Sequence, residues 1–146
     1  MVTLRPATPV DAPVCAAILN AWIDATPWMP RVHPADDVVR HYRETVFPKR
    51  SVTVAEDEAI LGYVAVDAEE NEVTSLFVAE GARRRGVGRA LLGAAKAERP
   101  GGLSLWTFQA NEGARRFYAR EGFVESRTTE GDNEERLADV ELVWRP

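Results

Sequence analysis

The chain has 146 residues, with 18 lysines and arginines against 23 aspartates and glutamates, a formal net charge of −5 and a single cysteine. This length fits a single domain over residues 1–146, and the negative charge disfavours a protein that mainly coats nucleic acid or an anionic membrane. One cysteine excludes an intrachain disulfide and a cysteine-rich metal site, and we expect no metal. Because there is no signal-peptide pattern and no apolar stretch near the ~20 residues that cross a bilayer, we expect a cytoplasmic protein.

The first third of the chain predicts one strand and two helices. Residues 2–7 alternate like a strand, and residues 8–25 fit a helix with Thr8 as its N-cap. The apolar residues at helical spacing in this helix are expected to face the core, namely Val14, Ala17, Ile18, Ala21 and Trp22. Three prolines make residues 26–34 a loop, and helical spacing resumes over residues 35–47.

The rest of the chain alternates strands with two more helices. One helix follows the stretch RRRGVG and the other lies within NEGARRFYAREGF. The fold class predicted by this order is α/β (α+β), a mixed, mostly antiparallel twisted sheet of about seven strands with four helices. The crossover from residues 73–80 to residues 103–108 is a βαβ unit, so these two strands should be parallel. The other strands after the first are expected at residues 51–56, 60–68, 123–129 and 138–144.

The stretch RRRGVGRALL at residues 83–92 places positive charge where a helix start is already positive. The helix macrodipole makes each of the three arginines unfavourable there by roughly 0.3 to 1 kcal/mol. Gly86 and Gly88 let backbone approach a ligand, and the free N–H groups of a helix start bind anions. We therefore expect a pyrophosphate here, although the spacing fits neither a Walker loop nor a dinucleotide fingerprint, and a solvated basic turn is the alternative.

Two sequence blocks, in the right order and at the right separation, carry a family resemblance. The first reads Arg83-Arg84-Arg85-Gly86-Val87-Gly88 and resembles the central motif of the GCN5-related N-acetyltransferase (GNAT) family, Gln/Arg-x-x-Gly-x-Gly/Ala after a strand. The second, NEGARRFYAREGF at residues 111–123, resembles the family block Asn-x-x-Ala-x-x-x-Tyr-x-x-x-Gly-Phe. The resemblance is specific over residues 72–124, and the order of the expected elements matches the family along the whole chain.

The resemblance implies that the chain binds acetyl-CoA as a co-substrate. The pyrophosphate would lie on the amides of residues 84–89, and the pantetheine arm would pair with backbone near Phe77 and Val78, which requires this strand to splay from its parallel partner. Asn111 would hydrogen-bond the arm, although its position also suits a helix N-cap. The cofactor-binding residues implied are Leu76, Phe77, Val78, Arg83, Arg84, Arg85, Gly86, Val87, Gly88, Arg89, Asn111 and Tyr118.

The resemblance also assigns candidate catalytic residues, because an amine must attack a thioester carbonyl and a thiolate must leave. Tyr118, which matches the family tyrosine, would protonate the departing sulfur, with plain core packing as the alternative. A backbone N–H near Val78 would polarise the carbonyl. Glu72, on the strand before the loop, is the candidate base, and His33, His41 or a chain of water molecules are the alternatives.

The acceptor would contact the proline-rich loop and the strand at residues 103–108, with an apolar lid over the core as the alternative for the loop. The implied function is transfer of an acetyl group from acetyl-CoA to a primary amine of a small molecule or peptide by direct attack. Acetylation of a protein N-terminus or lysine, a non-catalytic acyl-CoA-binding sensor and a homodimer stay open, whereas nucleic acid and membrane partners are not expected. The candidate acceptor contacts are Trp28, Met29, Arg31, His33, Trp106 and Phe108.

Overall fold

The computed structural model describes all residues from 1 to 146. Its strands are β1 (Thr3–Pro6), β2 (Ser51–Asp57), β3 (Ala59–Asp67), β4 (Glu72–Val78), β5 (Leu103–Phe108), β6 (Val124–Thr129) and β7 (Asp139–Trp144). Its helical segments are η1 (Pro9–Asp11), α1 (Ala12–Ala25), α2 (Ala35–His41), η2 (Tyr42–Val46), α3 (Phe47–Lys49), η3 (Glu80–Ala82), α4 (Val87–Glu98) and α5 (Glu112–Arg120). None of these helices has the length and apolar character needed to cross a membrane.

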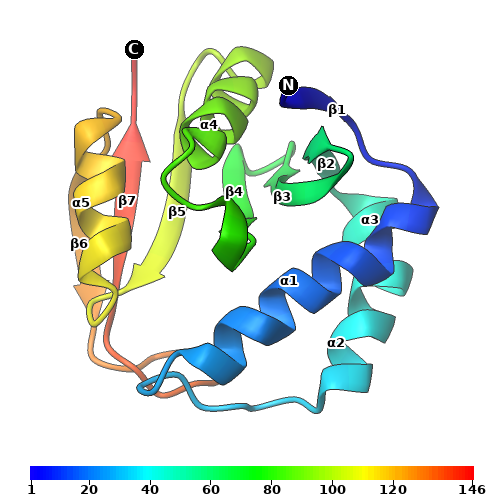
Figure 1. The fold of residues 1–146 in the computed structure, drawn as a ribbon. Coiled ribbons are helices and arrows are strands. Elements are labelled where there is room, and N and C mark those ends of the chain that lie inside the picture. Colours follow the sequence, from blue (N-terminus) through cyan, green and yellow to red (C-terminus); the bar gives the residue numbers. More distant parts are fainter.

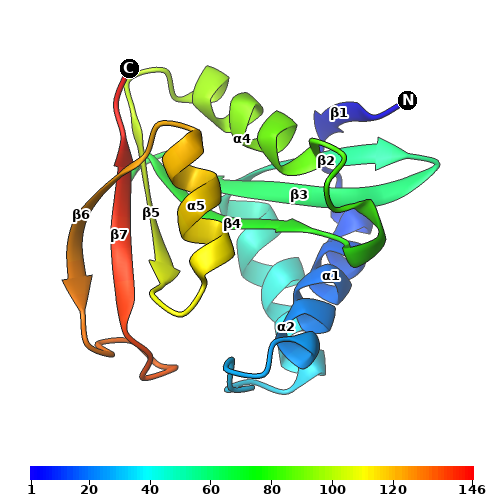
Figure 2. The same ribbon diagram turned by 60° about the vertical axis from the view of Figure 1, so that its left-hand side comes forward.

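All seven strands form one sheet in the order β1-β2-β3-β4-β5-β7-β6. Every neighbouring pair is antiparallel except β4 and β5, which run parallel. Figures 1 and 2 show α1 and α2 on one side of the β1–β4 part of the sheet and α4 on the other, with α5 beside β5, β6 and β7. The predicted α/β (α+β) class and the parallel crossover through α4 are confirmed.

Each face of the sheet has its own apolar core. One core joins α4 and α5 to the sheet and includes Leu91, Leu92 and Leu142, which are at most 1% exposed. The other core joins α1 and the helical segment after α2 to β2 and β3 through residues such as Cys15 and Tyr63. A fully buried leucine contributes about 1.5–3 kcal/mol, so these two cores hold the helices at fixed positions beside β4.

The core-facing side of α1 differs from the predicted one. Cys15 and Ala16 are fully buried, whereas Val14 is 43% exposed and both Ala17 and Ala21 face solvent. Apolar residues surround most of this helix, so their spacing alone does not single out one stripe. The chain also forms the short 3-10 turn η1 before α1, which moves the start of the α-helix along the chain.

The helix predicted at residues 35–47 extends to Lys49 and contains a π-helical turn. This turn, η2, begins at Tyr42, and both Tyr42 and Val46 point into the core beneath β2 and β3. π-helical turns are rare and occur often near functional sites. From this turn the Tyr42 hydroxyl reaches Ser75 on β4.

Candidate active site

The parallel strands β4 and β5 separate almost as soon as they pair. They are hydrogen-bonded in register only at Glu72 and Ser104, while β4 stays paired with β3 as far as Val78. The edge of β4 that faces β5 therefore carries unpaired backbone groups beyond Glu72, and such groups require a partner when they are enclosed. The expected splay is confirmed, and an extended ligand could bond to this edge as a strand does.

A cavity of about 780 Å³ occupies the gap between β4 and β5 and continues toward α1 and α2. The start of α5 and the β6–β7 loop complete its walls. Val78 and residues 83–89 lie outside its lining, at the end of β4 and beyond. The residues predicted for the site that do line it are Met29, His33, His41, Leu76, Phe77, Trp106, Phe108, Asn111 and Tyr118.

The arginine–glycine stretch forms the turn between β4 and α4. Arg84 has a φ of +66° and Gly86 a φ of +77°, so both adopt the left-handed conformation. Left-handed residues in such a turn direct successive N–H groups to one side and make a concave site for an anion. A Cβ atom built on Gly86 would meet no atom within 4 Å, so the space in front of this residue is open. The turn therefore fits a pyrophosphate.

The arginines of this turn differ in what they contact. Arg85 pairs with Asp57 at the end of β2, with 3.3 Å between Nη2 and Oδ2, and Arg89 pairs with Glu121 at 3.5 Å. Arg84 has no ion pair, and neither does its neighbour Arg83, so these two charges are free for an anion at the start of α4. The left-handed conformation of Arg84 costs roughly 1–3 kcal/mol, and strain of this kind clusters at functional sites.

Tyr118 combines a core ring with an available hydroxyl group. Its side chain is 7% exposed and packs edge-on against Phe117 and Phe123, yet the residue lines the cavity. The Tyr118 hydroxyl has no hydrogen-bond partner in the chain, and it is not fully buried, because no fully buried polar side-chain atom of this chain lacks a partner. Since Tyr118 lines the cavity, we assign the accessible side of its hydroxyl to the cavity. Burial raises the pKa of Tyr118 above its usual range, which keeps the hydroxyl protonated at neutral pH.

Asn111 is the N-cap of α5. Its Oδ1 accepts a hydrogen bond from the backbone N–H of Ala114 at 3.1 Å, as the sequence predicts for a cap. The Nδ2 group has no partner in the chain, and Asn111 lines the cavity. Capping therefore leaves the amide donor of Asn111 free for a ligand.

Besides Val78 and residues 83–89, three residues predicted to act in the site do not line the cavity. Glu72 lies at the closed end of the gap, where burial and then nearby carboxylates raise its pKa. Arg31 turns back onto α1 and pairs with Asp24 at 2.9 Å, so it holds the loop. Trp28 sits behind the lining, with its ring centroid 5.9 Å from that of Phe108.

An aromatic wall bridges the gap on the side of α1, and Trp22 is its one member that the sequence did not predict for the site. The ring of Trp22 lies 5.2 Å from Phe77 on β4 and 5.7 Å from Trp28, which in turn contacts Phe108 on β5. Helical spacing placed Trp22 in the core, because spacing cannot distinguish a wall of a cavity from a wall of the core. This wall gives the cavity an apolar side.

The rim of the cavity is acidic. Asp37, Glu134 and Glu135 line it, and no lysine or arginine does. Glu134 reaches across from the β6–β7 loop to His33, with 3.1 Å between Oε2 and Nε2. In the sequence Glu134 belongs to an acidic turn far from His33, and only the fold brings the two loops together. Both histidines of the chain, His33 and His41, line this rim.

Comparison with known proteins shows the family. Residues 48–125 match the model of the acetyltransferase (GNAT) domain, and this range contains the β4–α4 turn and Tyr118. The chain belongs to the GNAT family of acetyltransferases. As a GNAT protein it is an acetyl-CoA-dependent transferase, and this favours an enzyme over the sensor alternative.

Individual relatives agree with this assignment. The GNAT chain is 32% identical over 115 residues to peptidyl-lysine N-acetyltransferase YiaC from Escherichia coli (strain K12). The match covers 73% of this chain and 75% of YiaC. The solved apo form of YjaB from Escherichia coli has a TM-score of 0.79 and 22% identity over 99% of this chain and 97% of YjaB. The structure of yncA from Salmonella typhimurium with acetyl-CoA has a TM-score of 0.74 and 20% identity, over 99% of this chain and 94% of the yncA chain. At these identities the two structures show the shared fold.

Proposed function

We propose that this GNAT enzyme acetylates a primary amine at the end of an apolar chain, and that its acceptor class is a lysine side chain in a peptide. The observation that carries the proposal is the cavity beside β4, with its aromatic wall, its acidic rim and no lysine or arginine in its lining. An alkylammonium group suits aromatic faces and carboxylates. An amino acid whose carboxylate lies beside its amine would find no cation in this cavity.

The relative YiaC supports the same acceptor class, because its name is that of a peptidyl-lysine N-acetyltransferase. The whole of residues 1–146 would act as one domain, since both walls of the gap and both loops of the rim are needed to form the cavity. A small-molecule amine with an apolar chain is the second acceptor that this cavity would admit.

The donor would bind across the gap between β4 and β5. The amides of residues 84–89 would hold the pyrophosphate, and Arg83 would add charge beside it. The unpaired edge of β4 at Phe77 and Val78 would pair with the pantetheine arm, and the free Nδ2 of Asn111 would donate to it from α5. Bound in this way, acetyl-CoA would supply an activated acetyl group at the cavity.

The proposed reaction is direct attack of the amine on the thioester carbonyl, so that a C–N bond forms and the C–S bond breaks. Tyr118 would give its hydroxyl proton to the leaving sulfur, because its raised pKa keeps that proton until a thiolate appears. The amine would lose its proton to water in the cavity, from which Tyr118 would recover one. Glu72 lies at the closed end of the gap, so we place this proton transfer at the open rim, near His33 and His41.

Release of free CoA thiol tests the proposal directly. We would compare a peptide with one free lysine, the same peptide with that lysine already acetylated, and a free amino acid with an unblocked α-amine. We expect turnover with the first peptide and none with the second. Equal turnover of the amino acid and the lysine peptide would contradict the acceptor class, and no thiol release with any amine would contradict acetyl transfer.

A pair of charge-neutralising variants tests the role of the rim. Glu134→Gln combined with Glu135→Gln should raise the KM for the lysine peptide roughly 3- to 10-fold, because two carboxylates near the acceptor's charge are lost. The KM for acetyl-CoA should not change. Glu130→Gln is the matched control, because Glu130 is exposed on the same loop but does not line the cavity. An equal effect of the control would contradict a local role for the rim.

A further inference from the structure

A chain of hydroxyl groups runs from the core to the cavity beside β4. Tyr63 is fully buried and Tyr42 is 3% exposed, and their hydroxyl oxygens lie 2.5 Å apart. The same Tyr42 hydroxyl also lies 3.5 Å from the Oγ of Ser75, which lines the cavity. Three hydroxyls from η2, β3 and β4 therefore form one line that ends at the ligand space.

The direction of the hydrogen bonds in this line follows from counting protons. Each tyrosine has one hydroxyl proton, and the hydroxyl of Tyr63 has no partner other than Tyr42. The reverse order would make the same two bonds but leave the buried proton of Tyr63 without an acceptor, so Tyr63 donates to Tyr42 and Tyr42 donates to Ser75. Burial raises the pKa of both tyrosines, so both remain protonated donors. The proton of Ser75 is then free to point into the cavity.

Ser75 lies next to an irregularity of β4. The register with β3 pairs Val66 with Val73 but Ala65 with Ser75, so Thr74 is an extra residue in β4. The Thr74 hydroxyl is already engaged, because it donates to the carbonyl of Ala65 at 3.3 Å. Ser75 is therefore the hydroxyl on this part of β4 that remains available to a ligand.

The position of Ser75 also matches the expected end of the donor. β4 runs toward the turn that would hold the pyrophosphate, so an arm paired at Phe77 and Val78 would extend back along β4 and bring its thioester toward Ser75. Ser75 and Phe77 are two residues apart, so their side chains lie on the same face of the strand. The gap closes beyond this point, at Glu72 and Ser104.

We propose that Ser75 is a catalytic residue that donates a hydrogen bond to the carbonyl oxygen of the thioester, with Tyr42 and Tyr63 as positioning residues. The inference rests on the proposed acetyl transfer. When the amine attacks, the electron pair of the C=O bond moves to oxygen, and a donor already aimed at this oxygen stabilises the developing charge. Hydroxyls aligned in series polarise one another and strengthen the last donor.

Three variants separate this role from a structural one. Ser75→Ala should lower kcat roughly 100-fold, as expected when one donor to an oxyanion is lost. The Kd for acetyl-CoA in calorimetric titration should change at most a few-fold, because the bond to the neutral carbonyl is weaker than the bond to the oxyanion. Ser75→Thr keeps the hydroxyl and should retain most of the activity. Tyr42→Phe should cause a smaller loss of kcat than Ser75→Ala, because it removes only the polarisation. Ser104→Ala is the matched control on β5, because Ser104 does not line the cavity, and it should behave as the wild type.

An infrared measurement provides a readout that needs no turnover. The stretching frequency of an isotope-labelled thioester carbonyl in bound acetyl-CoA should be lower in the wild type and in Ser104→Ala than in Ser75→Ala, because a hydrogen bond weakens the C=O bond. An unchanged frequency in Ser75→Ala overturns the proposal, and so does a raised acceptor KM with an unchanged kcat. If the wild type acetylates no amine, the proposed function fails, and the infrared shift still decides the contact of Ser75.

Discussion

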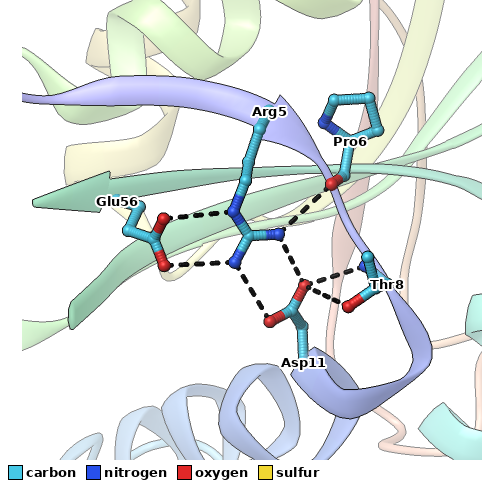
Figure 3. A network of polar contacts seen from close by, with 5 residues as sticks. All are labelled: Arg5, Pro6, Thr8, Asp11 and Glu56. Carbon is cyan, nitrogen blue, oxygen red and sulfur yellow. Dashed lines mark hydrogen bonds and ion pairs between the residues drawn. The ribbon is translucent and has the colours of Figure 1, made fainter. Parts of the chain in front are cut away.

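Two polar regions of this molecule differ in how completely the chain satisfies its own groups. In the N-terminal region the Arg5 guanidinium donates to two carboxylates at once, at 2.8 Å to Oδ2 of Asp11 and at 3.1 Å to Oε1 of Glu56 (Figure 3). The backbone N–H of Thr8 donates to the same Asp11 oxygen at 2.8 Å. This cluster joins β1, β2 and the start of α1, and its donors and acceptors are used within the chain.

The gap between β4 and β5 shows the opposite condition. The edge of β4, the hydroxyl of Tyr118 and the Nδ2 of Asn111 have no partner in the chain, although all of them border one cavity. Polar groups that are satisfied internally contribute to folding, whereas enclosed groups without partners are available for a ligand. Substitutions in the N-terminal cluster should therefore change stability and leave turnover intact, and substitutions in the gap should do the reverse.

Among substitutions around the gap between β4 and β5, the largest effect is expected from Gly86→Val. The left-handed φ of +77° is unfavourable for a β-branched residue, and the open space in front of Gly86 is where the phosphates would lie. We expect the Kd for CoA, measured by calorimetric titration, to rise by at least about 100-fold, because the amides that bind the anion are displaced. The circular dichroism spectrum should stay that of a folded chain.

The matched control for this prediction is Gly93→Val. Gly93 is on the adjoining helix α4, a Cβ there also meets open space, and its φ is not left-handed. Normal CoA affinity in Gly86→Val, or equal losses in the two variants, would show that the turn is not a backbone site for the anion.

Tyr118→Phe should have the next largest effect. The ring keeps its contacts in the core and no hydrogen bond within the chain is lost, so the melting temperature should change little. Removal of the proton donor should lower kcat by roughly 100-fold, with the Kd for acetyl-CoA unchanged. Steady-state kinetics together with calorimetry separate the two quantities. An unaltered kcat would leave Tyr118 with packing alone.

Arg5→Ala tests the N-terminal cluster. Asp11 is only 5% exposed, and the loss of its cation leaves an enclosed carboxylate without compensation. We expect the melting temperature to fall by several degrees, and kcat at a temperature where the variant stays folded to match the wild type. A large drop in kcat at that temperature would show that the N-terminal cluster also affects catalysis in the gap between β4 and β5.

The same cluster predicts a dependence of stability on pH. The hydrogen bond from Arg5 holds the pKa of Asp11 below its usual range, and likewise that of Glu56. Because the folded-state pKa lies below the unfolded value of about 3.9 for aspartate, the stabilisation is present above roughly pH 4 and is lost as the pH falls through the folded-state pKa. Denaturant unfolding at a series of acidic pH values should show a shallower decline in Arg5→Ala than in the wild type. Parallel declines would contradict this assignment.

Arg85→Ala should have the smallest effect, although it lies in the same turn as Gly86. Its side chain already pairs with Asp57, and its backbone amide, the proposed donor to the phosphate, survives the substitution. We expect CoA affinity to fall only a few-fold at physiological salt, where exposed charges are screened. A loss larger than that of Gly86→Val, measured in the same titration, would assign the anion site to side chains instead of backbone.

Much of this architecture could be predicted from the sequence because its signals are local. Alternation and helical spacing located all seven strands and the helices, and the glycine positions marked the turn that adopts left-handed conformations. The resemblance to a family then assigned Asn111 and Tyr118, and both line the cavity.

The remaining features depend on contacts between distant segments. Spacing indicates that residues such as Trp22 share a face, but not what that face meets, so the place of Trp22 in the aromatic wall and the true core side of α1 were missed. Glu134 meets His33 only because β7 returns beside β5 and brings the β6–β7 loop to the rim. The hydroxyl line through Tyr42 requires a π-helical turn and an extra residue in β4, and neither has a reliable sequence signal.

The single hydrogen-bonded rung between β4 and β5 also ties substrate binding to the cooperativity of folding. Backbone hydrogen bonding is nearly interrupted there, so the sheet consists of two ladders that share one rung. A donor arm bonded to the edge of β4 and to Asn111 beyond the end of β5 would extend the ladder as a further strand. The bonds that hold the donor would then also count toward the free energy of unfolding. Amide hydrogen exchange should slow together in β4 and β5 when CoA is added, while β1 and β6 at the outer edges change little. An enzyme of this construction is most resistant to unfolding in cells that keep it supplied with its donor.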